Sequence, residues 1–153
     1  PQGYAPSNGN NASLVLLVSL STGQRVLLPG DMEKQVEQRV LTDFDKGLGT
    51  VDVLLMPHHG SKTSSTAAFV QKVRPKVVIA QTGYKNHYGF PKGEVVQRYH
   101  DVGSEVWDTA LGAVSVSFEQ GKLEVAQFSL PSQSKRADVQ ALLDKTPWYF
   151  SGL

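Results

Sequence analysis

Residues 51–73 read VDVLLMPHHGSKTSSTAAFVQKV, and this stretch decides the fold class. Its first six residues form a nearly continuous apolar run with the length of a buried strand. A polar turn follows, and residues 66–73 have the pattern of a short helix for which Ser64 or Ser65 would supply the N-cap. A buried strand that leads through a polar loop into a helix is typical of layered α/β proteins.

The flanking sequence continues this alternation of strands and helices. Apolar runs predict strands over residues 13–20, 25–28 and 76–81, and residues 105–109, 113–118 and 122–128 predict three further strands. Residues 32–41 have helical spacing, with Asp31 in the N-cap position. A third helix is expected over residues 92–103, with Pro91 at its first position and Gly103 at its end. The order predicts an α/β sheet covered by helices, followed by a terminal helix and an aromatic tail over residues 135–150.

Composition narrows the possible functions. The chain has 153 residues, a formal net charge of +1 and no cysteine. This length suits one domain or a large part of one. The absence of cysteine excludes disulfides and cysteine-ligated zinc, and the charge excludes a field over the whole protein that would attract nucleic acid. Residues 1–13 are polar and lead directly into a core strand, so we expect the chain to be part of a longer protein.

Two polar turns lie where predicted strands end. Asp31 follows the strand over residues 25–28 and would serve as a helix cap, as a metal ligand, or as both. His58 and His59 follow the strand over residues 51–56. Neighbouring residues of an extended chain point to opposite sides, so we expect at most one of the two to face a given pocket. Imidazole is a common ligand of zinc and similar metals, although Ser- and Gly-rich turns also have purely structural explanations.

Residues after the histidine pair have the chemistry to hold a phosphate. Ser61 and Thr63 carry hydroxyls, and the backbone amides at the start of the following helix would add donors. In the loop over residues 82–91, Asn86 and Tyr88 would either line a cleft or pack the loop. His100 lies on the polar side of its helix and is expected to be solvated. One aspartate with one or two histidines supplies only part of a catalytic metal site, because a single catalytic zinc takes three protein ligands and water.

Four segments carry a family resemblance. NNASLVLLV (10–18), VLLPGD (26–31), VDVLLMPHHGSKTSS (51–65) and GYKNHYGFP (83–91) resemble, in that order and spacing, the C-terminal metallo-β-lactamase-fold region of ComEC-type DNA-internalisation competence proteins. The resemblance covers roughly residues 8–118. It implies that residues 1–130 form the C-terminal portion of an αββα sandwich and that residues 131–153 form a C-terminal helix and tail.

The resemblance also implies a function and a set of roles. The parent would be an inner-membrane channel for transforming DNA, with this domain on the outer, periplasmic face, where it hydrolyses the strand that is not imported. Zinc or manganese would be held by Asp31 with His58 or His59, and these residues would be the catalytic group. Single-stranded DNA would be contacted without sequence preference. The residues implied in that contact are Asn10, Asn11, Ser13, Ser61, Lys62, Thr63, Asn86 and Tyr88, with Tyr84 as a further stacking surface and Lys85 near the phosphates.

Two departures keep other functions open. The histidine-rich motif that supplies the remaining metal ligands in this family does not occur in these 153 residues, and Phe90 stands where many relatives have histidine. The alternatives are a non-catalytic domain that binds DNA or a protein partner, and a metallo-hydrolase of a small molecule. We expect this chain alone to be inactive and mostly metal-free, and to expose an apolar face that favours a homodimer or is covered by the tail at Trp148, Tyr149 and Phe150.

Overall fold

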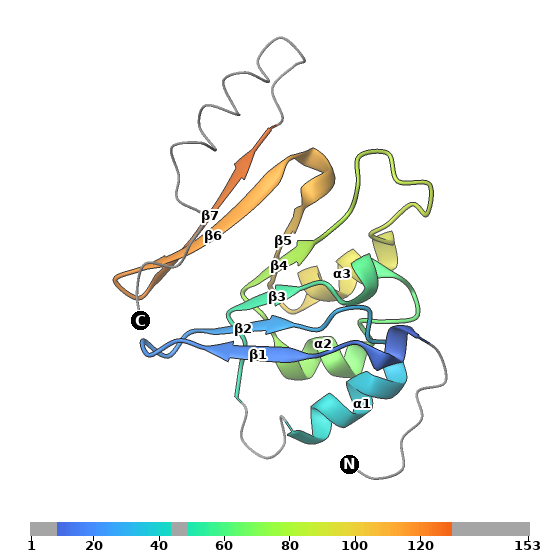
Figure 1. Cartoon of the computed structure of the whole chain (residues 1–153), viewed down its shortest axis with the longest axis horizontal. Helices are drawn as coiled ribbons and strands as arrows, with labels where there is room; N and C mark the ends of the chain where they lie inside the picture. Colours follow the sequence, from blue (N-terminus) through green and yellow to red (C-terminus); the bar gives the residue numbers. More distant parts are fainter. Residues whose placement is uncertain (1–8, 44–48, 130–153) are drawn as a thin grey trace.

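The computed structural model of the chain describes residues 9–43 and 49–129. Its main element is a mixed five-stranded sheet in the order β1–β2–β3–β4–β5 (Figure 1). The strands are β1 (Leu16–Ser19), β2 (Arg25–Leu28), β3 (Val53–Leu55), β4 (Val77–Ala80) and β5 (Glu105–Asp108). β1 is antiparallel to β2, and the other neighbours are parallel. The carboxyl ends of β2 to β5 therefore meet at one edge of the sheet.

Three helices connect the parallel strands and cover one face of the sheet. They are α1 (Lys34–Asp43), α2 (Ala67–Val73) and α3 (Gly93–Asp101). The sheet contributes Leu27, Leu54 and Val78 to the core on this side, and the helices contribute residues such as Phe69 and Tyr99, each at most 2% exposed. Figure 1 shows α1 and α2 below the strands and α3 to the right of β3 and β4. This order of strands and helices is the α/β arrangement that the sequence predicts.

A second, two-stranded sheet covers the opposite face. β6 (Ala113–Glu119) and β7 (Lys122–Phe128) form an antiparallel hairpin that follows the short 3₁₀ helix η4 (Thr109–Leu111). Alternate hairpin residues, Val114, Val116 and Val125 among them, pack against Val53 and Ile79 of the main sheet. On the edge strand β1 and just before it, Leu14, Leu16 and Val18 remain 42–73% exposed. The result is a helix–sheet–sheet arrangement with apolar residues exposed at one edge.

Several element boundaries differ from the sequence prediction. Helix α1 begins at Lys34, and the Glu33 carbonyl accepts from the Glu37 amide at 3.1 Å, so Asp31 is not its N-cap. Thr66, rather than Ser64 or Ser65, caps α2 by accepting from the Phe69 amide. Each of these boundaries moves toward the carboxyl end because tertiary hydrogen bonds occupy the predicted caps.

Helix α3 also begins later than the sequence predicts. Lys92 is the N-cap of α3, and Gly93, not Pro91, is its first residue. The predicted terminal helix and tail lie outside the described residues. Among the helices that the structure describes, none has the length and apolarity to cross a membrane.

Candidate metal centre

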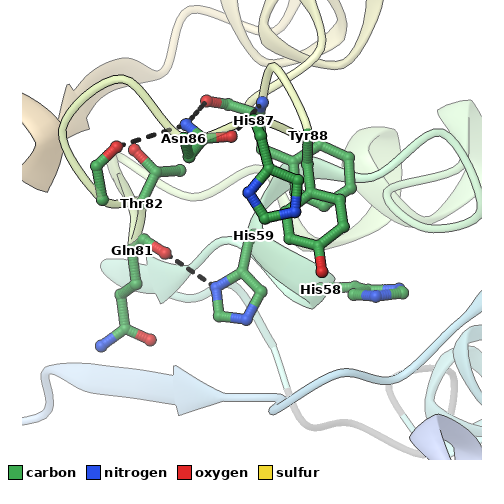
Figure 2. A pocket seen from close by; sticks show the side chains of 9 residues that line it. His58, His59, Gln81, Thr82, Asn86, His87 and Tyr88 are labelled. Atoms are coloured by element: carbon green, nitrogen blue, oxygen red, sulfur yellow. Dashed lines mark hydrogen bonds between the residues drawn. The ribbon is translucent and has the colours of Figure 1, made fainter.

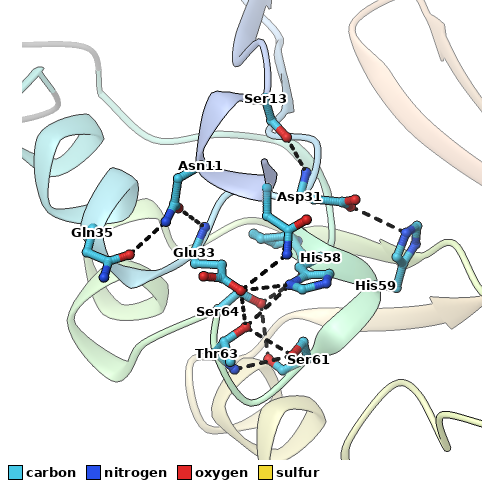
Figure 3. Close-up of polar contacts among 12 residues, drawn as sticks. Asn11, Ser13, Asp31, Glu33, Gln35, His58, His59, Ser61, Thr63 and Ser64 are labelled. Atoms are coloured by element: carbon cyan, nitrogen blue, oxygen red, sulfur yellow. Dashed lines mark hydrogen bonds and ion pairs between the residues drawn. The ribbon is translucent and has the colours of Figure 1, made fainter. Parts of the chain in front are cut away.

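The candidate residues gather where the parallel strands end (Figure 3). Asp31 follows β2, and His58 and His59 follow β3 in the short 3₁₀ segment η3 (Pro57–Gly60). The His58 amide donates to the Gly30 carbonyl at 3.1 Å, which joins the two loops directly. Asp31 and His59 thus approach each other from adjacent strand ends, as the sequence predicts. The carboxyl edge of a parallel sheet is the usual place for a binding site in α/β folds.

The two histidines occupy an uncommon backbone conformation. His58 has φ 46° and ψ 43°, and His59 has φ 55° and ψ 18°, both in the left-handed region. Such positions cost free energy in residues other than glycine and cluster at functional sites. The turn separates the two imidazoles, whose ring centroids lie 6.3 Å apart at an interplanar angle of 65°. Each ring therefore has its own hydrogen-bond partners, but both rings line one cavity. The expectation that at most one of the two faces a given pocket is wrong, because the backbone here is left-handed and not extended.

The hydrogen bond of His59 determines which ring nitrogen faces Asp31. His59 Nδ1 lies 2.7 Å from the Gln81 carbonyl oxygen, and a carbonyl can only accept, so Nδ1 carries the proton (Figure 2). When the ring is neutral, Nε2 therefore presents its lone pair. Nε2 lies 3.3 Å from Asp31 Oδ1. Two acceptors then face each other, an arrangement that requires a proton or a cation between them.

The spacing fits a zinc-like cation. Ligand distances of about 2.0–2.2 Å at a tetrahedral angle place two ligand atoms about 3.4 Å apart, against the 3.3 Å between His59 Nε2 and Asp31 Oδ1. The side chains are 45% and 41% exposed, so solvent reaches both. A backbone carbonyl on the remote nitrogen is the common way in which proteins orient a metal-ligating histidine. Across residues 9–43 and 49–129, no group of three or more His, Cys, Asp or Glu could hold a metal ion, so these two ligands would need further ones.

His58 is directed away from Asp31. Its Nδ1 lies 3.3 Å from Thr63 Oγ1 and 3.5 Å from Glu33 Oε1. Thr63 in turn donates to Glu33 Oε1 at 2.9 Å. This cluster ties the histidine turn to the segment before α1. The geometry therefore favours His59 as the ligand and His58 as a residue that fixes the turn.

Asn11 and Ser13 accept hydrogen bonds from the backbone of the Asp31 loop. Ser13 Oγ accepts from the Asp31 amide at 3.0 Å. Asn11, which lies in the 3₁₀ segment η1 (Asn10–Ala12), accepts from the Glu33 amide at 3.0 Å and donates to Gln35 at 2.7 Å. Asn10 donates to Glu33 Oε1 at 3.4 Å. These contacts assign the polar residues of the NNAS segment to positioning of the loop.

The loop after the histidines is held from within. Ser61 is buried, and its Oγ accepts from the Thr63 amide at 3.3 Å. Lys62 is 62% exposed, with Nζ 3.5 Å from Glu94 Oε2. The expectation that amides at the start of α2 would hold a phosphate is wrong for Ser65 and Thr66, because both amides donate to the buried carboxylate of Glu37.

Glu37 holds the loop that follows the histidines, and no pattern of the sequence predicts this role. It is fully buried on α1, and burial raises the pKa of its carboxyl above the ordinary value of 4.5 despite hydrogen bonds from the Ser65–Thr66 segment. Ser65 Oγ lies 2.9 Å from the hydroxyl of buried Tyr99, and Arg98 donates to the Ser65 carbonyl at 2.9 Å. The sequence contains one indication that Glu37 is buried, because it lies three and four residues before Val40 and Leu41, on the apolar side of the helix.

A cavity of about 520 Å³ opens beside His59 (Figure 2). It is lined by residues from two strand ends and the following loop, namely His58, His59, Gln81, Thr82, Gly83, Asn86, His87, Tyr88 and Phe90. Asn86 and Tyr88 thus lie at the cavity, with Asn86 locking the loop through two hydrogen bonds to the Phe90 backbone. Tyr84 does not line it, and His100 is exposed on α3.

The fold and this geometry define an α/β protein with a carboxylate and an imidazole at the carboxyl edge of its sheet. Comparisons with known proteins show which proteins this chain is related to. No protein-family model matches the chain. It is 40% identical over 128 residues to Recombination protein 2 of Haemophilus influenzae and 39% identical over 97 residues to ComE operon protein 3 of Bacillus subtilis. It is 33% identical over 113 residues to Competence protein ComA of Neisseria gonorrhoeae.

These matches cover 83%, 63% and 73% of the chain, respectively. The chain is therefore related to one region of the ComEC-type competence proteins. It spans only 16%, 12% and 16% of the lengths of these three relatives.

Proposed function

We propose that this chain supplies part of a divalent-metal site for phosphodiester hydrolysis in a competence protein that takes up DNA. The observation that carries the proposal is the contact between His59 Nε2 and Asp31 Oδ1 at 3.3 Å, with the opposite nitrogen of the ring bound to a carbonyl. The relatives named for competence support the role in DNA uptake. Hydrolysis of the strand that is not imported is the activity that this geometry and that role favour together.

The role of each side chain follows from its position. Asp31 and His59 would hold zinc or manganese, which when bound supplies a Lewis acid and an activated water for attack on phosphorus. Ser13 and the Gly30 carbonyl fix the backbone on the two sides of this pair. Lys62 lies exposed in the loop after His59 and would offer a mobile positive charge to a phosphate, with Glu94 as its alternative partner.

The layers of the fold support a larger architecture. Helices cover one face of the main sheet and the hairpin β6–β7 covers the other, and this layering supports an assignment to an αββα sandwich. We propose that residues 1–130 form the C-terminal portion of such a domain. The remaining metal ligands would come from the other portion, and the domain would lie on the periplasmic face of a membrane channel.

The test compares variants in the full-length protein that contains this chain. Cleavage of single-stranded DNA and bound zinc and manganese are measured for the wild type, Asp31→Ala and His59→Ala, with His100→Ala as the control histidine. We expect both site variants to lose at least 100-fold in cleavage rate, because each removes one ligand of the reacting centre. Unchanged cleavage in Asp31→Ala would exclude the proposal. A full-length protein that binds neither metal would identify a non-catalytic DNA-binding domain, the alternative that Phe90 favours.

A further inference from the structure

The cavity beside His59 has one wall made of aromatic rings. Tyr88 and Phe90 are stacked with ring centroids 5.6 Å apart and an interplanar angle of 18°. The ring of His87 lies 3.9 Å from that of Tyr88, tilted by 38°. Figure 2 shows His87 and Tyr88 side by side above the imidazoles of His58 and His59. The wall thus stands directly beside the candidate metal ligands.

Hydrogen bonds from Asn86 and Lys92 to the backbone of the loop hold this aromatic wall in place. Asn86 donates to the Phe90 carbonyl and accepts from the Phe90 amide, both at 2.8 Å. Lys92 Nζ donates to the Tyr88 carbonyl at 2.6 Å and lies 5.3 Å from the centre of the Phe90 ring. Tyr88 nevertheless remains 61% exposed. The loop therefore presents a positioned ring to solvent, and such a surface binds a flat ligand at low entropic cost.

Gln81 also lines the cavity and adds groups that can form hydrogen bonds. The side-chain amide of Gln81 makes no hydrogen bond within the part of the chain that the structure describes, and it has one acceptor and two donors. Because it offers both kinds of group, it can pair with the edge of any base. The cavity of about 520 Å³ lies within the range of about 300–1,000 Å³ found for small-molecule sites. The chemistry fits a planar heteroaromatic group joined to a phosphate.

We propose that this cavity takes one unpaired nucleobase of a single-stranded DNA, adjacent to the phosphodiester that Asp31 and His59 would engage. The inference rests on the proposed function and deepens it by assigning a cavity that binds one base beside the candidate metal site. A base in a duplex is paired and stacked and cannot enter a side-chain cavity without being flipped out. Stacking on an aromatic wall is independent of sequence, because every base has a π face. The cavity would therefore select single strands by shape.

The test uses this chain and a short single-stranded oligodeoxynucleotide that carries one 2-aminopurine, with a chelator present so that no cleavage occurs. We expect binding to quench the fluorescence of the base. Tyr88→Ala should weaken binding by about 5- to 150-fold, the effect of losing one base–aromatic stack. Tyr88→Phe should stay within about threefold of the wild type. Phe128→Ala is the matched control, because Phe128 is 56% exposed on β7 and does not line the cavity.

The possible results separate the cavity from the metal site. The inference is overturned if no quenching occurs, if Phe128→Ala loses as much affinity as Tyr88→Ala, or if a duplex of the same sequence quenches equally. Circular dichroism of each variant establishes that it is folded, and a folded Tyr88→Ala with wild-type affinity also overturns it. Since the assay needs no metal, quenching with the expected variant pattern would persist even if the full-length protein cleaved nothing.

Discussion

Gly60 holds the histidine turn against the loop of the cavity, and its replacement by alanine tests how the site is assembled. Gly60 has φ +83°, in the left-handed region that side chains rarely adopt. An added Cβ would lie 2.5 Å from Pro91 Cβ, 2.9 Å from Pro91 Cα and 2.7 Å from Met56 Sδ. The Met56 side chain can turn away, but the proline ring and backbone cannot move without shifting the loop that carries Tyr88.

The expected magnitude follows from these two costs. Left-handed backbone in an L-residue costs roughly 1–2 kcal/mol, and an extra methyl group in a packed region costs roughly 1–3 kcal/mol. We therefore expect Gly60→Ala to lower the free energy of unfolding by about 2–5 kcal/mol. The hydrogen bond from the Lys92 amide to the Gly60 carbonyl, 3.0 Å long, should also be disturbed.

Urea unfolding and backbone amide spectra measure these effects. The matched control is Gly93→Ala, because an added Cβ at Gly93 meets nothing within 4 Å and its φ is not left-handed. We expect the control to change the free energy of unfolding by less than about 0.5 kcal/mol. The two variants could instead unfold at equal midpoints, with unchanged amide shifts at His58, His59 and Lys92. That result would show that Gly60 does not hold the histidine turn in place.

Three further predictions concern the residues around the site. Glu37→Gln should change stability by less than about 1 kcal/mol near pH 4.5, because the amide has the shape of the protonated carboxyl and keeps one carbonyl acceptor; since the raised pKa of Glu37 makes the wild type lose stability as pH rises above 4.5, the variant should become the more stable of the two toward neutral pH in urea titrations. Zinc competition titrations should show that His59→Gln abolishes binding whereas His58→Gln leaves it within about tenfold, and the opposite order would contradict the assignment. Ser13→Ala should weaken zinc binding about 10- to 100-fold in the same titration while circular dichroism stays unchanged.

The fold class could be predicted from hydrophobic pattern because the strands are short, apolar and separated by clear turns. The runs at Val53–Leu55 and Val77–Ala80 are buried on both faces, which gives a continuous apolar signal. Helix starts were less predictable. Ser64 and Ser65 are good capping residues by type, but Ser64 Oγ donates to the Pro57 carbonyl and Ser65 contacts Tyr99, so Thr66 caps the helix.

The site could be predicted as far as the residue types at strand ends. Asp31 and the histidine pair were identified because parallel strands bring their carboxyl ends together. The choice between His58 and His59 depends on the left-handed turn and on the Gln81 carbonyl, which no local pattern indicates. Glu37 likewise acts through the Ser65–Thr66 segment, 28 and 29 residues away in sequence, so its role required the structure.

We propose above all that one cation is bound by both Asp31 Oδ1 and His59 Nε2. Long-range ¹H–¹⁵N correlation spectra of the imidazoles, recorded while zinc is added to concentrations that saturate a weak two-ligand site, test it directly in this chain. We expect zinc to shift Nε2 of His59 while Nδ1 stays protonated, and we expect Asp31→Asn to remove the response. A zinc response at His58 or His87 instead, or a His59 ring with its proton on Nε2 in the presence of zinc, would contradict it.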